Sequence, residues 1–135
     1  MMIKVEDIFE VFYGTNLELN KLIQVKPNEG INFVSRTRSN NGVSAVVKKL
    51  DHVEPLERGL ISVAASGNSV METFVQPEPF YTGRDVYILR PKNDMTIKEK
   101  LFYCMCLKTN RYRFSYGRQA NRTLKNLLVP KEIPS

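Results

Sequence analysis

The sequence predicts an α+β fold in a single domain over residues 1–135: a twisted, mostly antiparallel sheet with one well-capped helix and short flanking helices. Several short β-prone runs follow one another along the chain, and turn signals rich in glycine or asparagine separate them. One later segment combines a helical pattern with a helix-start signal. The 135 residues, 42% of them hydrophobic, suffice for one core, and we find no internal repeat, low-complexity tract or linker.

The first half of the chain predicts a hairpin preceded by two shorter elements. Lys4–Tyr13 alternates partly between apolar and polar residues, which fits a strand or a short helix. Asn16–Lys26 is amphipathic, and a turn containing proline and glycine closes it. Ile31–Ser35 is a short β-prone run, and Val43–Leu50 is the strand that follows the turn at Asn40–Gly42. We expect this turn to be tight because an Asn-Gly pair readily adopts positive φ.

The middle of the chain predicts a second hairpin and a further strand. Residues 59–65 form a clear β-prone run, and residues 70–76 form the returning strand. Residues 66–69 contain the glycine of the turn between them. Residues 77–83 then connect to Arg84–Arg90, which alternates charged and apolar side chains and therefore predicts another strand.

The best-defined helix is predicted over Ile97–Thr109. Thr96 is the expected N-cap, and Glu99 lies three residues later, which is the capping-box pattern. Helical spacing predicts one apolar face made of Ile97, Leu101, Cys104, Met105 and the stem of Lys108. After it, Thr123–Leu128 predicts a short helical turn or a strand before Pro130.

Positive charge is concentrated in the last third of the chain. The formal net charge is +6, but residues 98–135 carry 9 Lys and Arg against 2 acidic residues, a net of +7. Residues 1–97 carry 11 Lys and Arg against 12 acidic residues, a net of −1. Such asymmetry indicates a polyanionic partner contacted mainly by the C-terminal third, although a solvated basic face is a common alternative.

Three segments carry side chains suited to nucleic acid. Residues 111–122 interleave four arginines with three aromatic residues, a glutamine and an asparagine. Arginine forks fit phosphate and guanine, whereas glutamine and asparagine can pair with adenine. Residues 35–42 form a polar loop with two arginines, and residues 66–69 form a turn whose amides could approach a phosphate, although either could be a plain exposed turn. The candidate DNA-binding residues are Arg36, Arg38, Asn40, Asn41, Lys48, Asn68, Arg111, Arg113, Tyr116, Arg118, Gln119 and Arg122.

Residues arranged for catalysis or metal binding are scarce. His52 is the one histidine of the chain, and no nucleophile elbow is present. Cys104 and Cys106 lie two apart on the predicted helix, a spacing that suits neither a disulfide nor a zinc pair. A metal-dependent nuclease would have to draw on Glu72, Glu78, Asp85 and Lys92, whose spacing matches no template. We therefore expect no catalytic site, no metal and no cofactor.

Several short motifs occur in order along nearly the whole chain. Ile3–Gly14 is similar to the pattern K-L-x-D-L-F-x-I-x-x-G, and Gly30–Val43 is similar to G-I-x-Y-I-S followed by N-N-G-V. Residues 59–67 follow G-x-I-S-V-A-x-x-G, Phe80–Leu89 matches the step into a last main strand, and Leu124–Pro130 follows L-x-x-L-x-V-P. Together these motifs resemble the target-recognition domain of type I restriction–modification specificity subunits and of related type II specificity subunits.

This resemblance implies a cytoplasmic α/β recognition domain that reads a short half-site in duplex DNA without catalysis of its own. It implies duplex DNA and a DNA methyltransferase or restriction subunit as partners. No membrane is expected, since no apolar run approaches the roughly 20 residues that span a bilayer. A complete specificity subunit has two such domains separated by long helical spacers, and no long heptad helix occurs here. A half-subunit, a subunit of a split system, a stand-alone reader and a homodimer are all compatible with the sequence.

Two other classes of function remain as alternatives. One is a small metal-dependent nuclease built on the same fold. The other is a non-catalytic protein-interaction or adaptor module. A protein that mimics DNA should be acidic, and the pI near 9.4 counts against that kind of adaptor.

Overall fold

The computed structural model describes residues 1–113 and 123–133. Two helices and nine strands occur in this part of the chain. In chain order they are β1 (Met2–Lys4), α1 (Val5–Ile8), β2 (Phe9–Tyr13), β3 (Ile31–Val34), β4 (Val43–Val47), β5 (Ile61–Ala64), β6 (Thr73–Val75), β7 (Phe80–Thr82), β8 (Val86–Pro91), α2 (Ile97–Thr109) and β9 (Leu128–Pro130). Short 3₁₀ turns cover Leu19–Lys21, Asn40–Gly42, Asn110–Arg113 and Leu124–Asn126.

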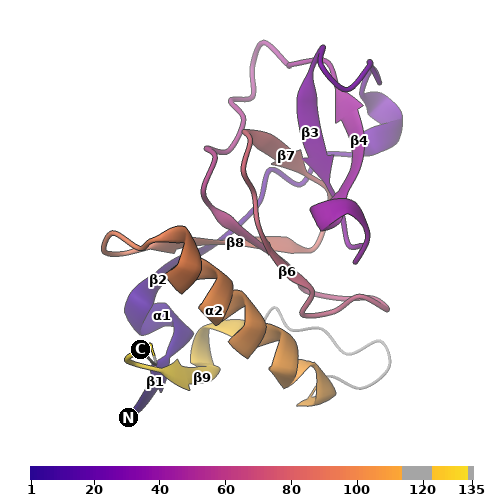
Figure 1. The fold of residues 1–135 in the computed structure, drawn as a ribbon. Helices are drawn as coiled ribbons and strands as arrows, with labels where there is room; N and C mark the ends of the chain where they lie inside the picture. The colour runs from indigo at the N-terminus through magenta and orange to yellow at the C-terminus, as the bar shows by residue number, and fades with distance from the viewer. Residues whose placement is uncertain (114–122, 134–135) are drawn as a thin grey trace.

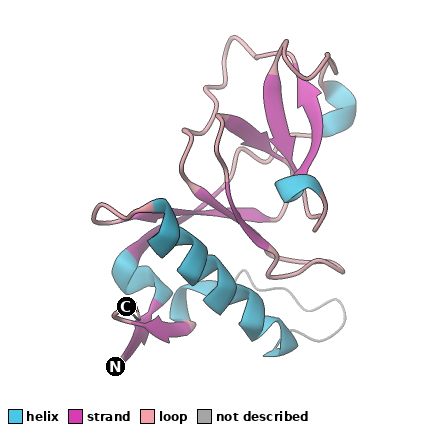
Figure 2. Ribbon diagram, in the orientation of Figure 1, coloured by secondary structure: helices cyan, strands magenta, loops and turns pink. Residues whose placement is uncertain are grey.

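The described strands form three sheets. A four-stranded sheet has the order β2-β8-β5-β6, a three-stranded sheet the order β4-β3-β7, and β1 pairs with β9. Every pair is antiparallel except β3 with β7. Figure 1 shows the three-stranded sheet at one end, the four-stranded sheet in the middle and the β1–β9 pair at the other end, with α2 across the middle. The α+β class and the mostly antiparallel pairing are confirmed. Figure 2 distinguishes the helices from the strands by colour.

Both predicted hairpins are present. In the first, β3 and β4 are joined by a turn in which Asn40, Asn41 and Gly42 have φ of 50°, 56° and 82°. This left-handed conformation is tolerated best by asparagine and glycine. The expectation of a tight turn is wrong, because residues 35–42 separate the paired Val34 and Val43, and the pairing shifts register between Phe33 and Val34. In the second hairpin β5 pairs with β6, but β6 begins only at Thr73 because the turn between them extends through Met71.

Neither of the two predicted N-terminal elements is a single helix or a single strand in the structure. Lys4–Tyr13 is a short helix followed by a strand, so both interpretations of this stretch are correct in part. The amphipathic stretch Asn16–Lys26 contains a 3₁₀ turn and an isolated β-bridge between Gln24 and Val47. Its side chains Leu17, Leu19 and Leu22 pack against the cluster around Phe33 and Tyr81. Its apolar side chains are therefore buried by tertiary packing without a regular helix.

Helix α2 begins where the capping box predicts. The Glu99 amide donates to Thr96 Oγ1 at 3.1 Å, and the Thr96 amide donates to Glu99 Oε1 at 3.0 Å. Most of the side chains predicted to form the buried face of α2 are exposed, so this prediction is wrong except at Cys104. Ile97, Leu101 and Met105 are 59%, 54% and 56% exposed, whereas the buried side chains are Tyr103, Cys104 and Leu107.

The face that α2 buries follows from its packing partners. Tyr103 packs edge-on against Phe9 with ring centroids 5.6 Å apart, and its hydroxyl donates to the carbonyl of Pro130 at 2.9 Å. The sequence favoured the wrong stripe because apolar residues occur around most of the helix, so periodicity did not select one face. Cys104 and Cys106 are free thiols, as expected, and burial raises the pKa of Cys104 to about 12.

Strand β7 lies inside residues 77–83, which the sequence predicts only as a connection. Phe80 and Tyr81 are fully buried, and Tyr81 is tied to the neighbouring loop through its hydroxyl. That hydroxyl donates to the Val53 carbonyl at 2.7 Å and accepts from the Leu50 amide at 3.0 Å. Strand β7 pairs in parallel with β3, which is distant in the sequence. Because the two strands are not joined by a hairpin turn, no local sequence pattern predicts β7.

The two ends of the described chain meet at β1 and β9 (Figure 1). Thr123–Leu128 contains a 3₁₀ turn followed by the start of β9, and the Val5 amide donates to the Leu127 carbonyl at 2.9 Å. No helix in the described part of the chain is both long and apolar enough to cross a membrane.

Candidate functional site

An open cleft of about 990 Å³ lies where several connecting segments meet. The segment after β2, the loop after β3, the β5–β6 turn and the β7–β8 turn all contribute to it. The cleft-lining residues are Tyr13, Asn16, Leu17, Glu18, Leu19, Asn20, Phe33, Ser35, Arg36, Ser44, Gly67, Asn68, Gly83, Arg84 and Asp85. Its walls therefore carry guanidinium, carboxylate, amide and hydroxyl groups from segments far apart in the sequence.

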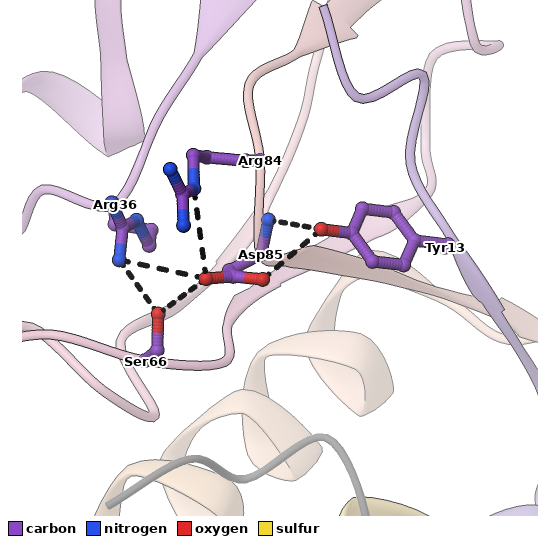
Figure 3. Close-up of polar contacts among 5 residues, drawn as sticks. All are labelled: Tyr13, Arg36, Ser66, Arg84 and Asp85. Atoms are coloured by element: carbon purple, nitrogen blue, oxygen red, sulfur yellow. Dashed lines mark hydrogen bonds and ion pairs between the residues drawn. The ribbon is translucent and has the colours of Figure 1, made fainter. Parts of the chain in front are cut away.

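Arg36, Ser66 and Asp85 form a connected polar cluster at the cleft (Figure 3). Arg36 Nη1 donates to Ser66 Oγ at 2.6 Å and lies 3.7 Å from Asp85 Oδ2. The Ser66 hydroxyl in turn donates to Asp85 Oδ2 at 2.8 Å. Arg84 Nε is 4.0 Å from the same oxygen, and its side chain is 76% exposed. One carboxylate thus faces two guanidinium groups and one hydroxyl.

Tyr13 fixes Asp85 from the opposite side (Figure 3). The Tyr13 hydroxyl donates to Asp85 Oδ1 at 3.1 Å and accepts from the Asp85 amide at 2.5 Å. Asp85 itself has φ of 57°, the left-handed conformation that a tight turn requires. Burial raises the pKa of Tyr13 above its ordinary value of 10.0, which favours the protonated hydroxyl that donates to Asp85.

The carboxyl of Asp85 is held in its ionised form. Burial by itself would raise the pKa of Asp85. Hydrogen bonds from Ser66 and Tyr13, together with the charges of Arg36 and Arg84, outweigh burial and lower that pKa below the ordinary value of 3.8. The cluster therefore contains a carboxylate, and not a carboxylic acid, at neutral pH.

Replacing Asp85 with asparagine is expected to destabilise the fold at neutral pH by on the order of 1 kcal/mol, because charged hydrogen bonds are lost. A carboxyl with a lowered folded-state pKa stabilises the fold above its unfolded pKa and loses that contribution as the pH falls through the folded-state pKa. The stability difference between wild type and Asp85→Asn should therefore shrink at pH values below 3.8. Denaturant unfolding at pH 7, 5 and 3 measures this difference.

The control for this titration is Asp51→Asn. Asp51 is exposed, and it makes no hydrogen bond or ion pair within the described residues. This variant should match wild type at every pH. A constant gap between wild type and Asp85→Asn from pH 7 to pH 3 would contradict the electrostatic account of the cluster.

The loop after β3 places its predicted residues in different settings. Arg36 lines the cleft, and Arg38 is exposed without a hydrogen bond or ion pair to the described residues. The side-chain amides of Asn40 and Asn41 donate to the carbonyls of Val43 and Val75 at 3.1 and 3.0 Å. These two amides serve the turn and its attachment to β6.

The remaining predicted residues are spread more widely. Asn68 lines the cleft, and Lys48 follows β4 at the end away from the 35–42 loop. Arg111 donates to the Asn68 carbonyl and lies 3.5 Å from Glu72, which places the end of α2 beside the β5–β6 turn. Arg113 is in the 3₁₀ turn that follows α2. Tyr116, Arg118, Gln119 and Arg122 lie outside the described residues.

Sequence reasoning missed Tyr13 and Arg84 as residues of the cleft, and from the 66–69 turn it named the side chain of Asn68 but not that of Ser66. Asp85 was considered only as a loose nuclease carboxylate, together with Glu72, Glu78 and Lys92. The Gly83-Arg84-Asp85 turn is the sequence signal that could have drawn attention to Arg84 and Asp85. Glu72 pairs with Arg111 and Asp85 with Arg36, and within the described residues no group of three His, Cys, Asp or Glu side chains could hold a metal.

The chain is similar to several known proteins. A family model described as the type I restriction modification DNA specificity domain matches residues 1–130. The specificity subunit of the type II restriction enzyme BgcI from Heyndrickxia coagulans is 30% identical over 127 residues, which cover 93% of this chain and 36% of that protein. The chain thus spans about a third of the length of this curated relative.

Solved structures share the fold. The type I restriction–modification S subunit from M. genitalium superposes with a TM-score of 0.68 at 18% identity, over 96% of this chain and 33% of that chain. A chain of a type I restriction–modification system, from a structure that describes complex assembly and conformational transition, gives a TM-score of 0.71 at 14% identity over 96% and 33%. The HsdS subunit from Thermoanaerobacter tengcongensis gives 0.68 at 14% identity over 96% and 32%.

Proposed function

Because the chain belongs to the type I restriction modification DNA specificity domain family, we propose that it recognises a short base sequence in duplex DNA for a restriction–modification system. The observation that carries this proposal is the cleft. Arg36, Asn68 and Arg84 come from three separate connecting segments and line one open surface. Hydrogen-bond donors presented together on loops are what base-edge recognition in a groove requires.

We propose that residues of the cleft contact bases and that the basic C-terminal third of the chain contacts mainly phosphates. Arg36 and Asn68 face bases from the cleft, and Arg38 extends the same surface from the 35–42 loop. The basic C-terminal third supplies phosphate contacts, since it carries a net +7. Its proposed phosphate contacts are Arg113 and Tyr116, with Lys48 as an additional cation.

Other residues of the C-terminal third have different proposed roles. Arg111 pairs with Glu72 at 3.5 Å and donates to the Asn68 carbonyl, and it is proposed to hold the β5–β6 turn at the DNA-binding surface. The proposed contacts to base edges from this part of the chain are Arg118, Gln119 and Arg122. Asn40 and Asn41 contribute by shaping the loop.

The proposed module has no catalytic site of its own. The described residues offer no group suited to a catalytic metal, and the curated relative is named as a specificity subunit of a restriction enzyme. The module would present its DNA site to a methyltransferase or restriction subunit, which would carry out the chemistry. Incubation of the purified chain with plasmid DNA and Mg²⁺ or Mn²⁺ should leave the plasmid intact, whereas nicking would favour the nuclease alternative.

Selection from a random pool of duplex oligonucleotides tests recognition directly. We expect the chain to enrich one short sequence and to prefer it over a scrambled duplex in competition binding at two salt concentrations. Arg38→Ala should cost about 1–3 kcal/mol of binding to the selected duplex, since Arg38 carries an uncompensated charge at the proposed surface.

The matched control for Arg38→Ala is Arg90→Ala. The guanidinium of Arg90 lies 3.3 Å from Glu10, 3.1 Å from Glu57 and 4.9 Å from the Phe12 ring centroid. Its charge is already neutralised within the protein, so its removal should leave DNA binding unchanged. If the chain binds neither the pool nor any duplex in dilute buffer, the proposed function is wrong.

A further inference from the structure

The guanidinium of Arg36 is anchored at one nitrogen only. Nη1 makes the contacts with Ser66 and Asp85. Within the described residues, no hydrogen bond or ion pair involves Nη2 or Nε. Arg36 lines the cleft, and its side chain is 33% exposed. One edge of the planar fork is thus fixed to the protein, which leaves donors on the other edge for a ligand.

The pairing with Asp85 disfavours phosphate as that ligand. At Arg36 itself, the carboxylate of Asp85 offsets the charge of the guanidinium and repels a phosphate that approaches it. The net positive charge of the cluster is on Arg84, which is 76% exposed and lies beside the same carboxylate. A base edge is neutral, so the pair of Arg36 and Asp85 does not repel it. Guanine offers two acceptors, O6 and N7, that match two donors of an arginine fork in the major groove. The local electrostatics therefore favour a base over the sugar-phosphate backbone.

We propose that Arg36 reads a guanine in the recognised sequence and that Asp85 and Ser66 are positioning residues that orient its guanidinium toward that base. This inference rests on the DNA recognition proposed above and adds which residue discriminates one base pair. Asp85 and Ser66 act through Arg36 and need not touch DNA. Tyr13 belongs to the same arrangement because it holds the second carboxylate oxygen of Asp85.

The contacts around Asp85 hold its carboxylate in place, so that it can orient the guanidinium of Arg36. Its carboxylate and its amide are held by Tyr13 and Ser66, and Ser66 is only 5% exposed. The three residues come from β2, the β5–β6 turn and the turn before β8, so the support is braced by three segments of the fold. A fork held in this way loses little conformational freedom on binding, which is the condition for sharp base discrimination.

The test uses the duplex selected from the random pool by the wild-type chain, and a panel in which each base pair of that duplex is changed in turn. We expect Arg36→Ala to abolish discrimination at one G·C pair, where wild type should discriminate about 5- to 150-fold. Arg36→Lys should do the same, because lysine keeps the charge but lacks the fork. Asp85→Asn and Ser66→Ala should reduce discrimination at that same base pair and leave the other positions unchanged.

Two further measurements separate positioning from a structural effect. The double variant Arg36→Ala/Asp85→Asn should discriminate no worse than Arg36→Ala alone, since Asp85 acts only through Arg36. The dependence of affinity on salt should be the same for Arg36→Ala as for wild type. Arg90→Ala is the matched control, because Arg90 lies outside the cleft and pairs with Glu10 and Glu57, and it should keep discrimination at every position of the duplex. Thermal melting of each variant establishes that it is folded.

The outcomes distinguish this inference from the proposed function. If wild type selects no sequence, the proposed function fails, and the positioning inference fails with it. If wild type selects a sequence but Asp85→Asn weakens binding evenly across the panel, Asp85 is structural and only the inference is overturned. The inference is also overturned if Arg36→Lys keeps the discrimination, or if Arg36→Ala lowers the salt dependence as the loss of a phosphate contact would. Ser66 is buried, so Ser66→Ala can fail to fold. Arg36→Lys changes a partly exposed side chain at the cleft, and this variant then provides the decisive measurement.

Discussion

Replacing Leu107 with alanine is expected to lower the free energy of unfolding by about 2–5 kcal/mol, because it opens a cavity where α2 meets the core. Leu107 is fully buried in the cluster that contains Phe9, Ile61 and Leu89. The surrounding strands cannot collapse far into the space left by the missing side chain, so both the transfer energy and the contacts are lost. Urea unfolding followed by circular dichroism measures the loss.

Leu101→Ala is the matched control on the same helix. Leu101 is 54% exposed, so its truncation should change the free energy of unfolding by no more than about 0.5 kcal/mol. The pair therefore tests directly which face of α2 is buried. A larger loss for Leu101→Ala would show that α2 packs through the face predicted from helical spacing, and equal losses would show that the burial of Leu107 does not distinguish the two faces.

Phe80→Ala should have an effect of similar size, about 3–5 kcal/mol, because Phe80 is fully buried in β7. Its ring belongs to a buried cluster with Val34, Leu60, Val86 and Ile88. If residues 77–83 were an ordinary exposed connection, the same truncation would cost little. Thermal unfolding of the purified variant gives the answer.

Glu78→Ala is the control for this second prediction. Glu78 lies in the same connection as Phe80 but is exposed, so its loss should be nearly neutral for stability. A stable Phe80→Ala variant would mean that β7 is not part of the core. The Phe80→Ala protein should also bind DNA more weakly if it loses the strand, because the Gly83 amide donates to the Val34 carbonyl at 2.9 Å and so ties the Gly83–Asp85 turn to β3.

The cleft shows how far local patterns can predict a binding site. Arg36 and Asn68 were predicted from loops rich in polar residues, and both line the cleft. Asn40 and Asn41 were predicted as DNA-binding residues of the 35–42 loop, and their side-chain amides donate to backbone carbonyls. A sequence shows that an asparagine occupies a turn, but it does not show whether the side chain faces the chain or a ligand.

The amino-acid sequence alone determined the local features of this protein. Turn chemistry at Asn40–Gly42 predicted the first hairpin, and the Thr96–Glu99 capping box predicted the start of α2, because both signals act over a few neighbouring residues. The order of its motifs was enough to suggest the family.

Only the tertiary structure decided which face of α2 is buried, which strand β7 pairs with and which side chains meet at the cleft. It selected the Tyr103, Cys104 and Leu107 face of α2, paired β7 with β3, and brought Arg36 to Ser66 and Asp85. Each of these depends on segments that are dozens of residues apart and meet only when the core forms. Local periodicity carries no information about such encounters, since the partner that decides them is not in the neighbouring sequence.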